Sequence, residues 1–246
     1  MNPQAAEKNN VEKKMARKII LGGLVMLLSA FWQAQAQEAK TPYANMAPLG
    51  QYLITDHNAE IALARSAAPD SISRDAEILV LGPHGYETAA KGDNGFVCVV
   101  QRSWTAGIDD PDFWNPKLRA PICFNPPAAR SYLPIVIKKT ELILAGQSKT
   151  QMFDIIKAAF DRKELPTIET GAMCYMMSKQ QYLSDSGGHW HPHLMFFFPG
   201  TDAVTWGADL PGSPILESKD PEDRLTVFLI PVGKWSDGAA APTDAP

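Results

Sequence analysis

A short apolar run near the N-terminus determines which part of this chain forms the folded protein. Residues 19–31 are almost wholly apolar and follow four basic residues between positions 13 and 18. A helix that spans a bilayer needs about 20 apolar residues, so this run of 13 fits a secretory signal peptide better. Ala34 and Ala36 supply the small residues at which a signal peptidase cuts. We therefore predict a cleavable signal peptide over residues 1–36, with a transmembrane anchor as the alternative.

The predicted leader implies an exported protein, either periplasmic or extracellular, without stable membrane insertion after cleavage. No cysteine precedes Cys98, so a lipid anchor near the cleavage point is excluded. Met15 is an alternative start, because a compact basic and apolar leader follows it directly. The sequence favours no particular oligomeric state.

The charge balance argues against nucleic acid as a partner. The whole chain has 23 Lys and Arg against 27 Asp and Glu. The leader holds five of the basic residues and two of the acidic ones, which leaves 18 against 25, a net charge of −7. Binding to nucleic acid requires a basic face, and so does binding to an anionic membrane surface. The acidic balance of the chain after the leader therefore argues against both.

The 210 residues after the leader are enough for one well-buried core and few for two. Residues 37–47 are small and polar, and we expect a flexible segment there. Residues 48–237 form the predicted globular domain. Residues 238–246 consist of Gly, Ala, Pro, Thr and Asp, which predicts a disordered tail.

Three cysteines remain after the leader, so one disulfide can form and one thiol is left over. Cys98 and Cys123 lie in two apolar segments, and we favour this pair. A bridge between them would close a loop of about 25 residues and contribute on the order of 3 kcal/mol. The alternative is that all three, including Cys174, are reduced core residues.

Spacing and turn residues predict the secondary structure. Asp56 can cap a helix that ends near Ala68, and Ser148 and Gln151 form a capping box for a second helix. A third helix is expected over residues 135–145. Strands are expected over residues 76–81, 86–90, 96–101, 171–178, 191–198 and 225–232.

Two connections complete the expected topology. Asn94 followed by Gly95 is typical of a tight hairpin turn. Residues 103–134 are rich in Pro, Asn, Asp and Trp, and we expect a long ordered loop there. Hairpins outnumber strand-helix-strand units, which favours a single α+β domain with a mainly antiparallel sheet and helices packed on one face.

The candidate site is a run of three alternating histidines, His189, His191 and His193. In a strand these side chains share one face at a spacing of roughly 7 Å, so two neighbours can converge on one metal. Neutral imidazole suits a divalent transition metal such as Zn or Cu, and nearby methionines would favour Cu. A missing ligand could come from His84, Asp185, Cys174 or Glu169.

Two alternatives to a metal site stay open. One histidine could be a buried hydrogen-bonding residue while the others are exposed. The chain could also be a non-catalytic envelope protein that binds a small molecule in an aromatic-lined pocket near Trp206 and Trp235. No nucleophile elbow, phosphate loop or dinucleotide motif is present, so no catalytic residue is predicted, and an enzymatic role is left open.

Overall fold

The computed structural model describes residues 43–185 and 190–242. The predicted signal peptide, most of the segment over residues 37–47 and His189 lie outside this part. Within it, no helix is long and apolar enough to cross a membrane. The helices are η1 (Leu49–Gln51), α2 (His57–Arg65), α3 (Asp70–Ser73), η2 (Ser103–Thr105), α4 (Pro126–Ser131), α5 (Leu133–Leu144), α6 (Lys149–Asp161) and η3 (Ala203–Trp206).

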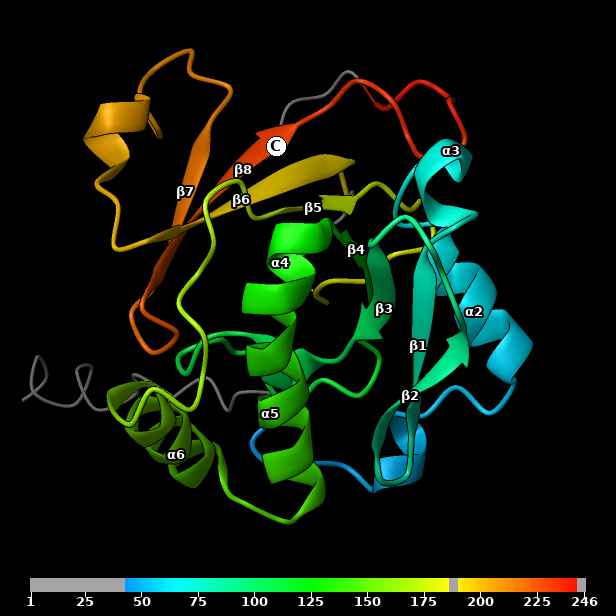
Figure 1. The fold of residues 1–246 in the computed structure, drawn as a ribbon, viewed down its shortest axis with the longest axis vertical. Coiled ribbons are helices and arrows are strands. Elements are labelled where there is room, and N and C mark those ends of the chain that lie inside the picture. The colour runs from blue at the N-terminus through cyan, green and yellow to red at the C-terminus, as the bar shows by residue number, and fades with distance from the viewer. Residues whose placement is uncertain (1–42, 186–189, 243–246) are drawn as a thin grey trace, which may run out of the picture. The chain divides into compact units, whose positions relative to one another are not determined.

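A single eight-stranded sheet runs through the described domain in the order β2-β1-β3-β4-β5-β6-β8-β7 (Figure 1). All neighbouring strands are antiparallel except β1 and β3, so the predicted α+β class and mainly antiparallel sheet are confirmed. The strands are β1 (Glu77–Gly82), β2 (Gly85–Ala90), β3 (Val97–Gln101), β4 (Ala120–Phe124), β5 (Met173–Met176), β6 (His193–Pro199), β7 (Leu216–Asp220) and β8 (Leu225–Pro231).

The pleat of the sheet separates two layers of packing. Val99 and Ile122 belong to a core that includes residues of α4 and α5. Their strand neighbours Cys98 and Cys123 belong to a second core with the alanines of α2. The helices therefore lie on both faces of the central strands, where the sequence placed them on one. The small side chains of α2, such as Ala64, let this helix approach the sheet closely on the second face.

Local capping signals fixed two helix starts as predicted. The Asp56 side chain accepts hydrogen bonds from the backbone N–H groups of Asn58 and Ala59 at the start of α2. At α6, the Ser148 hydroxyl accepts from the Gln151 N–H at 3.3 Å, and the Gln151 side chain accepts from the Ser148 N–H at 2.9 Å. These reciprocal bonds satisfy N–H groups that the first turn of a helix leaves free.

Residues 103–134 are not one long loop, as the sequence suggested. They contain β4 and α4, and every residue of β4 is buried. A strand that is buried on both faces does not show the alternation of polar and apolar residues by which a strand is usually predicted. Pro121 also argues against a central strand in a sequence-based prediction. The part that is irregular is held by Trp104, which is fully buried and donates its ring N–H to the Thr140 hydroxyl of α5 at 3.0 Å.

The turn over residues 92–95 is not a hairpin, which corrects a second prediction. β3 lies on the far side of β1 from β2 and runs parallel to β1. The turn therefore crosses over the start of β1, where Asp93 N–H donates to the Asp75 carbonyl and the Asn94 amide donates to the Ile72 carbonyl. Gly95 does adopt the positive φ that an Asn-Gly turn favours, at 75°. The turn was predicted, but the side on which the next strand pairs was not.

Gly92→Ala should destabilise the protein by at least about 2 kcal/mol, because the added Cβ would overlap the backbone of Ala76 and Glu77 at this crossing. Urea unfolding measures the loss. Gly233→Ala is the matched control, since nothing lies within 4 Å of its added Cβ. Equal stability of the two variants would contradict the close crossing.

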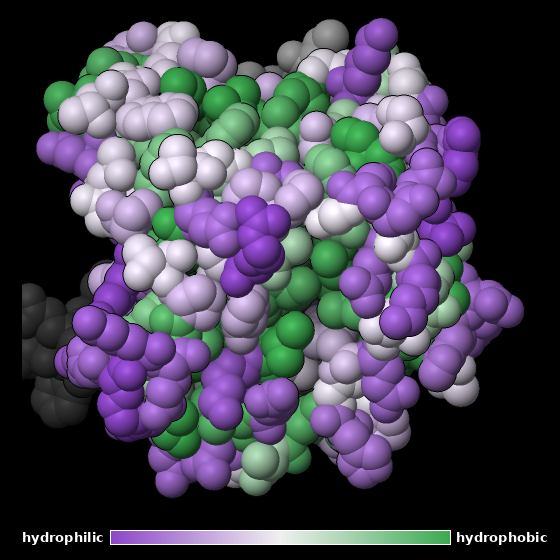
Figure 2. Space-filling model, in the orientation of Figure 1, coloured by the Kyte–Doolittle hydropathy of each residue, from purple (hydrophilic) through white to green (hydrophobic). Residues whose placement is uncertain are grey.

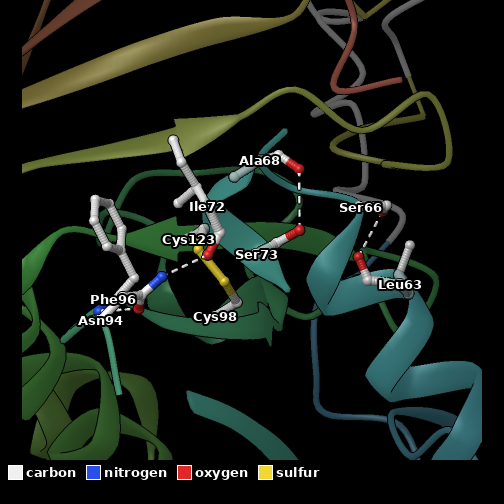
Figure 3. The surroundings of a disulfide bond; sticks show 9 residues. All are labelled: Leu63, Ser66, Ala68, Ile72, Ser73, Asn94, Phe96, Cys98 and Cys123. Carbon is white, nitrogen blue, oxygen red and sulfur yellow. Dashed lines mark hydrogen bonds between the residues drawn. A yellow bond between two sulfur atoms is a disulfide. The ribbon is translucent and has the colours of Figure 1, made fainter. Parts of the chain in front are cut away.

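The predicted disulfide joins Cys98 and Cys123, which lie opposite each other on β3 and β4 with their Cα atoms 4.0 Å apart. Figure 3 shows the bond beside Ile72 and the Asn94 side chain that anchors the crossing turn. Cys174 is the thiol left over, and it is buried. The bridge thus ties the two central strands beneath α2.

The C-terminal quarter of the domain holds β7 and η3, neither of which the sequence predicted. Trp206 of η3 stacks on Phe228 of β8 with ring centroids 4.6 Å apart. Figure 2 shows apolar side chains at the surface in this corner, where Val204 and Leu210 are strongly exposed. Beyond β8, Lys234 and Ala240 form an antiparallel bridge, so the first residues of the predicted disordered tail are hydrogen-bonded.

Candidate functional site

A cavity of about 520 Å³ lies against β6, β8 and β7, on the face of the sheet that carries α5. We call it the histidine pocket, because it contains both histidines of the predicted site that the structure describes. Most of its lining is apolar. Its residues are Gln101–Ser103, Thr105–Gly107, Asp110, Leu118, Ala120, Tyr132, Met176, Leu183, Trp190, His191, His193, Met195, Leu216, Ser218, Asp220, Val227, Leu229 and Pro231.

His191 and His193 both line this pocket, although the strand expected over residues 191–198 begins only at His193, so strand alternation does not itself place His191. His193 begins β6 on the same face as Met195, and its Nδ1 lies 2.9 Å from the backbone oxygen of His191. A carbonyl can only accept, so we assign the ring proton to Nδ1. The Nε2 atom then keeps a free lone pair, and it has no hydrogen-bond partner within the described ranges.

The environment of His193 favours the neutral imidazole. Burial lowers the pKa of His193, and this effect outweighs the hydrogen bond to the His191 carbonyl, which raises it. The nearby His191 ring lowers the pKa further, because two positive charges would repel. His193 is therefore a hydrogen-bond acceptor or a ligand at neutral pH.

The structure does not gather the other predicted ligands. Glu169 pairs with Arg130 at 2.7 Å, and His84 is exposed in the turn between β1 and β2. Asp185 accepts hydrogen bonds from Tyr43 and Tyr182, which together with Lys117 lower its pKa to about 2. In residues 43–185 and 190–242, no three His, Cys, Asp or Glu side chains lie close enough to hold a metal.

Polar residues at the end of β3 form part of the pocket that the sequence did not indicate. Gln101 and Ser103 are buried, and the Gln101 Nε2 and Ser103 Oγ atoms make no hydrogen bond to any described group. The side chain of the intervening Arg102 pairs with Glu60 of α2 at 2.9 Å. Buried polar groups without partners are uncommon in folded proteins and are often satisfied by water or a ligand.

A buried ion pair holds the outer wall of the pocket in place. Lys139 of α5 contacts Asp223 at 2.6 Å, and both side chains are about 1% exposed. The Asp223 N–H donates to the side chain of Asp220, which lines the pocket at the end of β7. Burial raises the pKa of Asp223 to about 7, although Lys139 lowers it. The pair therefore joins the turn between β7 and β8 to α5.

Asp223 should make the stability of the protein depend on pH. Its folded pKa lies above the unfolded value of about 3.9, so its contribution is full below pH 4 and is lost as the pH rises through 7. Asp223→Asn should therefore lose less stability than the wild type between pH 5 and pH 8. Urea unfolding at both pH values measures this difference. The exposed Asp154→Asn is the control, and a wild-type pH dependence in Asp223→Asn would contradict the assignment.

Comparison with known proteins identified no relative of this chain. No protein-family model matches the chain, and no curated protein or solved structure matches it significantly.

Proposed function

We propose that this protein binds a small, predominantly apolar molecule in the histidine pocket. The observation that carries the proposal is the pocket's lining: most of the surface that borders about 520 Å³ is apolar, and polar groups such as Gln101, Ser103 and His193 interrupt it. Small-molecule sites in proteins are commonly 300–1,000 Å³ and have this composition. The proposal assigns binding and no reaction.

The sheet register indicates how such a ligand would lie. Gln101 pairs with Ala120 on β4, whereas His193 lies three strands from β3. At about 4.8 Å per strand, Gln101 and His193 are roughly 14 Å apart, with Met176 and other apolar side chains between them. An elongated apolar body would lie along this wall. A donor on the ligand would bind Nε2 of His193.

We propose further that the protein is exported to the periplasm or the medium. The predicted signal peptide motivates this proposal, and the Cys98–Cys123 disulfide supports it, because such bonds persist mainly in oxidising compartments. In a reducing cytosol, Cys98 and Cys123 would be kept as thiols, and this disulfide would not persist.

The mature protein should begin near Gln37. The short apolar run and the residues Ala34 and Ala36 match a signal peptidase site better than a membrane span. Intact mass spectrometry of the protein expressed in a bacterial host with a secretion pathway measures the N-terminus. A mature form that retains residues 19–31 would contradict cleavage.

The folded protein should bind one molecule of the neutral fluorophore N-phenyl-1-naphthylamine, and its fluorescence should rise on binding. Leu216 lines the pocket on β7 and is 38% exposed, so Leu216→Trp should reduce the pocket volume without unfolding the domain. We expect at least about fivefold weaker binding, equivalent to about 1 kcal/mol.

Leu210→Trp is the matched control, because Leu210 is an exposed leucine outside the pocket. It should bind the fluorophore as the wild type does. The proposal fails if the wild type does not bind saturably, or if the two tryptophan variants weaken binding equally.

A further inference from the structure

The inner wall of the histidine pocket carries soft donor atoms on two adjacent strands. Met176 of β5 lies directly opposite His193 of β6, and Cys174 lies opposite Met195. Residues opposite each other in an antiparallel pair point to the same face. Met176, Met195 and His193 all line the pocket, so a nitrogen and two thioether sulfurs share one wall.

Strand geometry places these three side chains within reach of one ion. Opposite residues have Cβ atoms about 5 Å apart, and residues two apart on a strand are roughly 7 Å apart. A methionine side chain has three rotatable bonds, and metal–sulfur and metal–nitrogen bonds are about 2.3 and 2.0 Å at zinc sites. Met176, Met195 and His193 can therefore meet at a single point above the sheet.

The orientation of His193 also suits a ligand. Metal-binding histidines usually donate their second ring N–H to a carbonyl or carboxylate, which fixes the ring and leaves the other nitrogen free. His193 makes this bond to the His191 carbonyl at 2.9 Å. The Nε2 atom is left as the donor, on the wall that also carries the two thioethers.

We propose that His193, Met176 and Met195 bind a soft monovalent metal ion, Cu(I), on this wall. Thioether sulfur is a soft, uncharged donor that selects Cu(I), whereas Zn²⁺ is usually held by thiolates, several histidines or carboxylates. Asp110 and Asp220 line the same pocket, but no three His, Cys, Asp or Glu side chains of the described part gather as a site. The inference rests on the donor atoms and not on the cavity volume, and because both proposals use Nε2 of His193, Cu(I) and the donor of an apolar ligand would compete for this atom.

The test is a titration of the purified mature protein with Cu(I) under anaerobic, reducing conditions, against the chromogenic chelator bicinchoninate. We expect one Cu(I) per chain, with Zn²⁺ bound at least about a hundredfold more weakly. Met176→Leu and Met195→Leu keep the side-chain volume, so they should fold normally and each weaken Cu(I) binding about tenfold or more. His193→Gln should weaken it at least as much.

Matched variants separate this site from the other sulfur atoms. Met177→Leu removes a buried methionine that does not line the pocket, and it should leave the Cu(I) affinity unchanged. Cys174→Ala removes the thiol opposite Met195, and it should change the affinity only a few-fold. X-ray absorption at the copper edge should show both sulfur and nitrogen neighbours.

Three outcomes would overturn the proposal: no Cu(I) binding by the wild type, Zn²⁺ binding as tight as Cu(I), or binding lost only in Cys174→Ala. Each variant's melting temperature is measured in parallel, as is the N-phenyl-1-naphthylamine affinity of the wild type. A variant that loses Cu(I) but keeps the wild-type melting temperature supports direct ligation, and failure of the wild type to bind the fluorophore would count against the proposed apolar-ligand function only.

Discussion

The two-residue alternation of side chains along the strands is the constraint on which the rest of this structure depends. Along β3 and β4 it directs the Cys98–Cys123 disulfide toward α2, and directs Val99 and Ile122 into the core beneath α5. The same alternation continues into β6, where it brings His193 to the α5 side. Every proposed contact in the pocket follows from this parity.

The pocket exists because the sheet is wider than the helical layer on its α5 face. The helices of the described domain pack mainly on β1 to β5 (Figure 1). The corresponding face of β6, β8 and β7 is therefore covered only in part. The Lys139–Asp223 pair joins the turn between β7 and β8 to α5. A buried ion pair is costly to desolvate, so its presence here is better explained by the position it imposes on this turn than by stability.

The sequence predicted the features that depend on local spacing. The Ser148 capping box, the disulfide and the strand that carries His193 were all visible as short patterns. The sequence did not predict β4, because this strand is buried throughout and contains Pro121. It did not predict β7, because this strand is largely polar and lies at the edge of the sheet. The crossing of the Gly92 turn over β1 depends on which side of the sheet the chain takes, and a tertiary choice of this kind leaves little local signal.

The candidate site was predicted only in part, because the sequence shows local spacing but not which residues the fold brings together. The alternation of His191 and His193 was readable in the sequence. The Gln101 Nε2 and Ser103 Oγ atoms, which have no hydrogen-bond partner in the described part of the chain, became candidates only through their burial. Methyl NMR with ¹³C-labelled methionine tests most directly whether the pocket is a binding site. On addition of N-phenyl-1-naphthylamine, the methyl signals of Met176 and Met195 should shift, while that of Met152, buried in another core, should not. No shift at Met176 and Met195, or an equal shift at Met152, would contradict a ligand site in the histidine pocket.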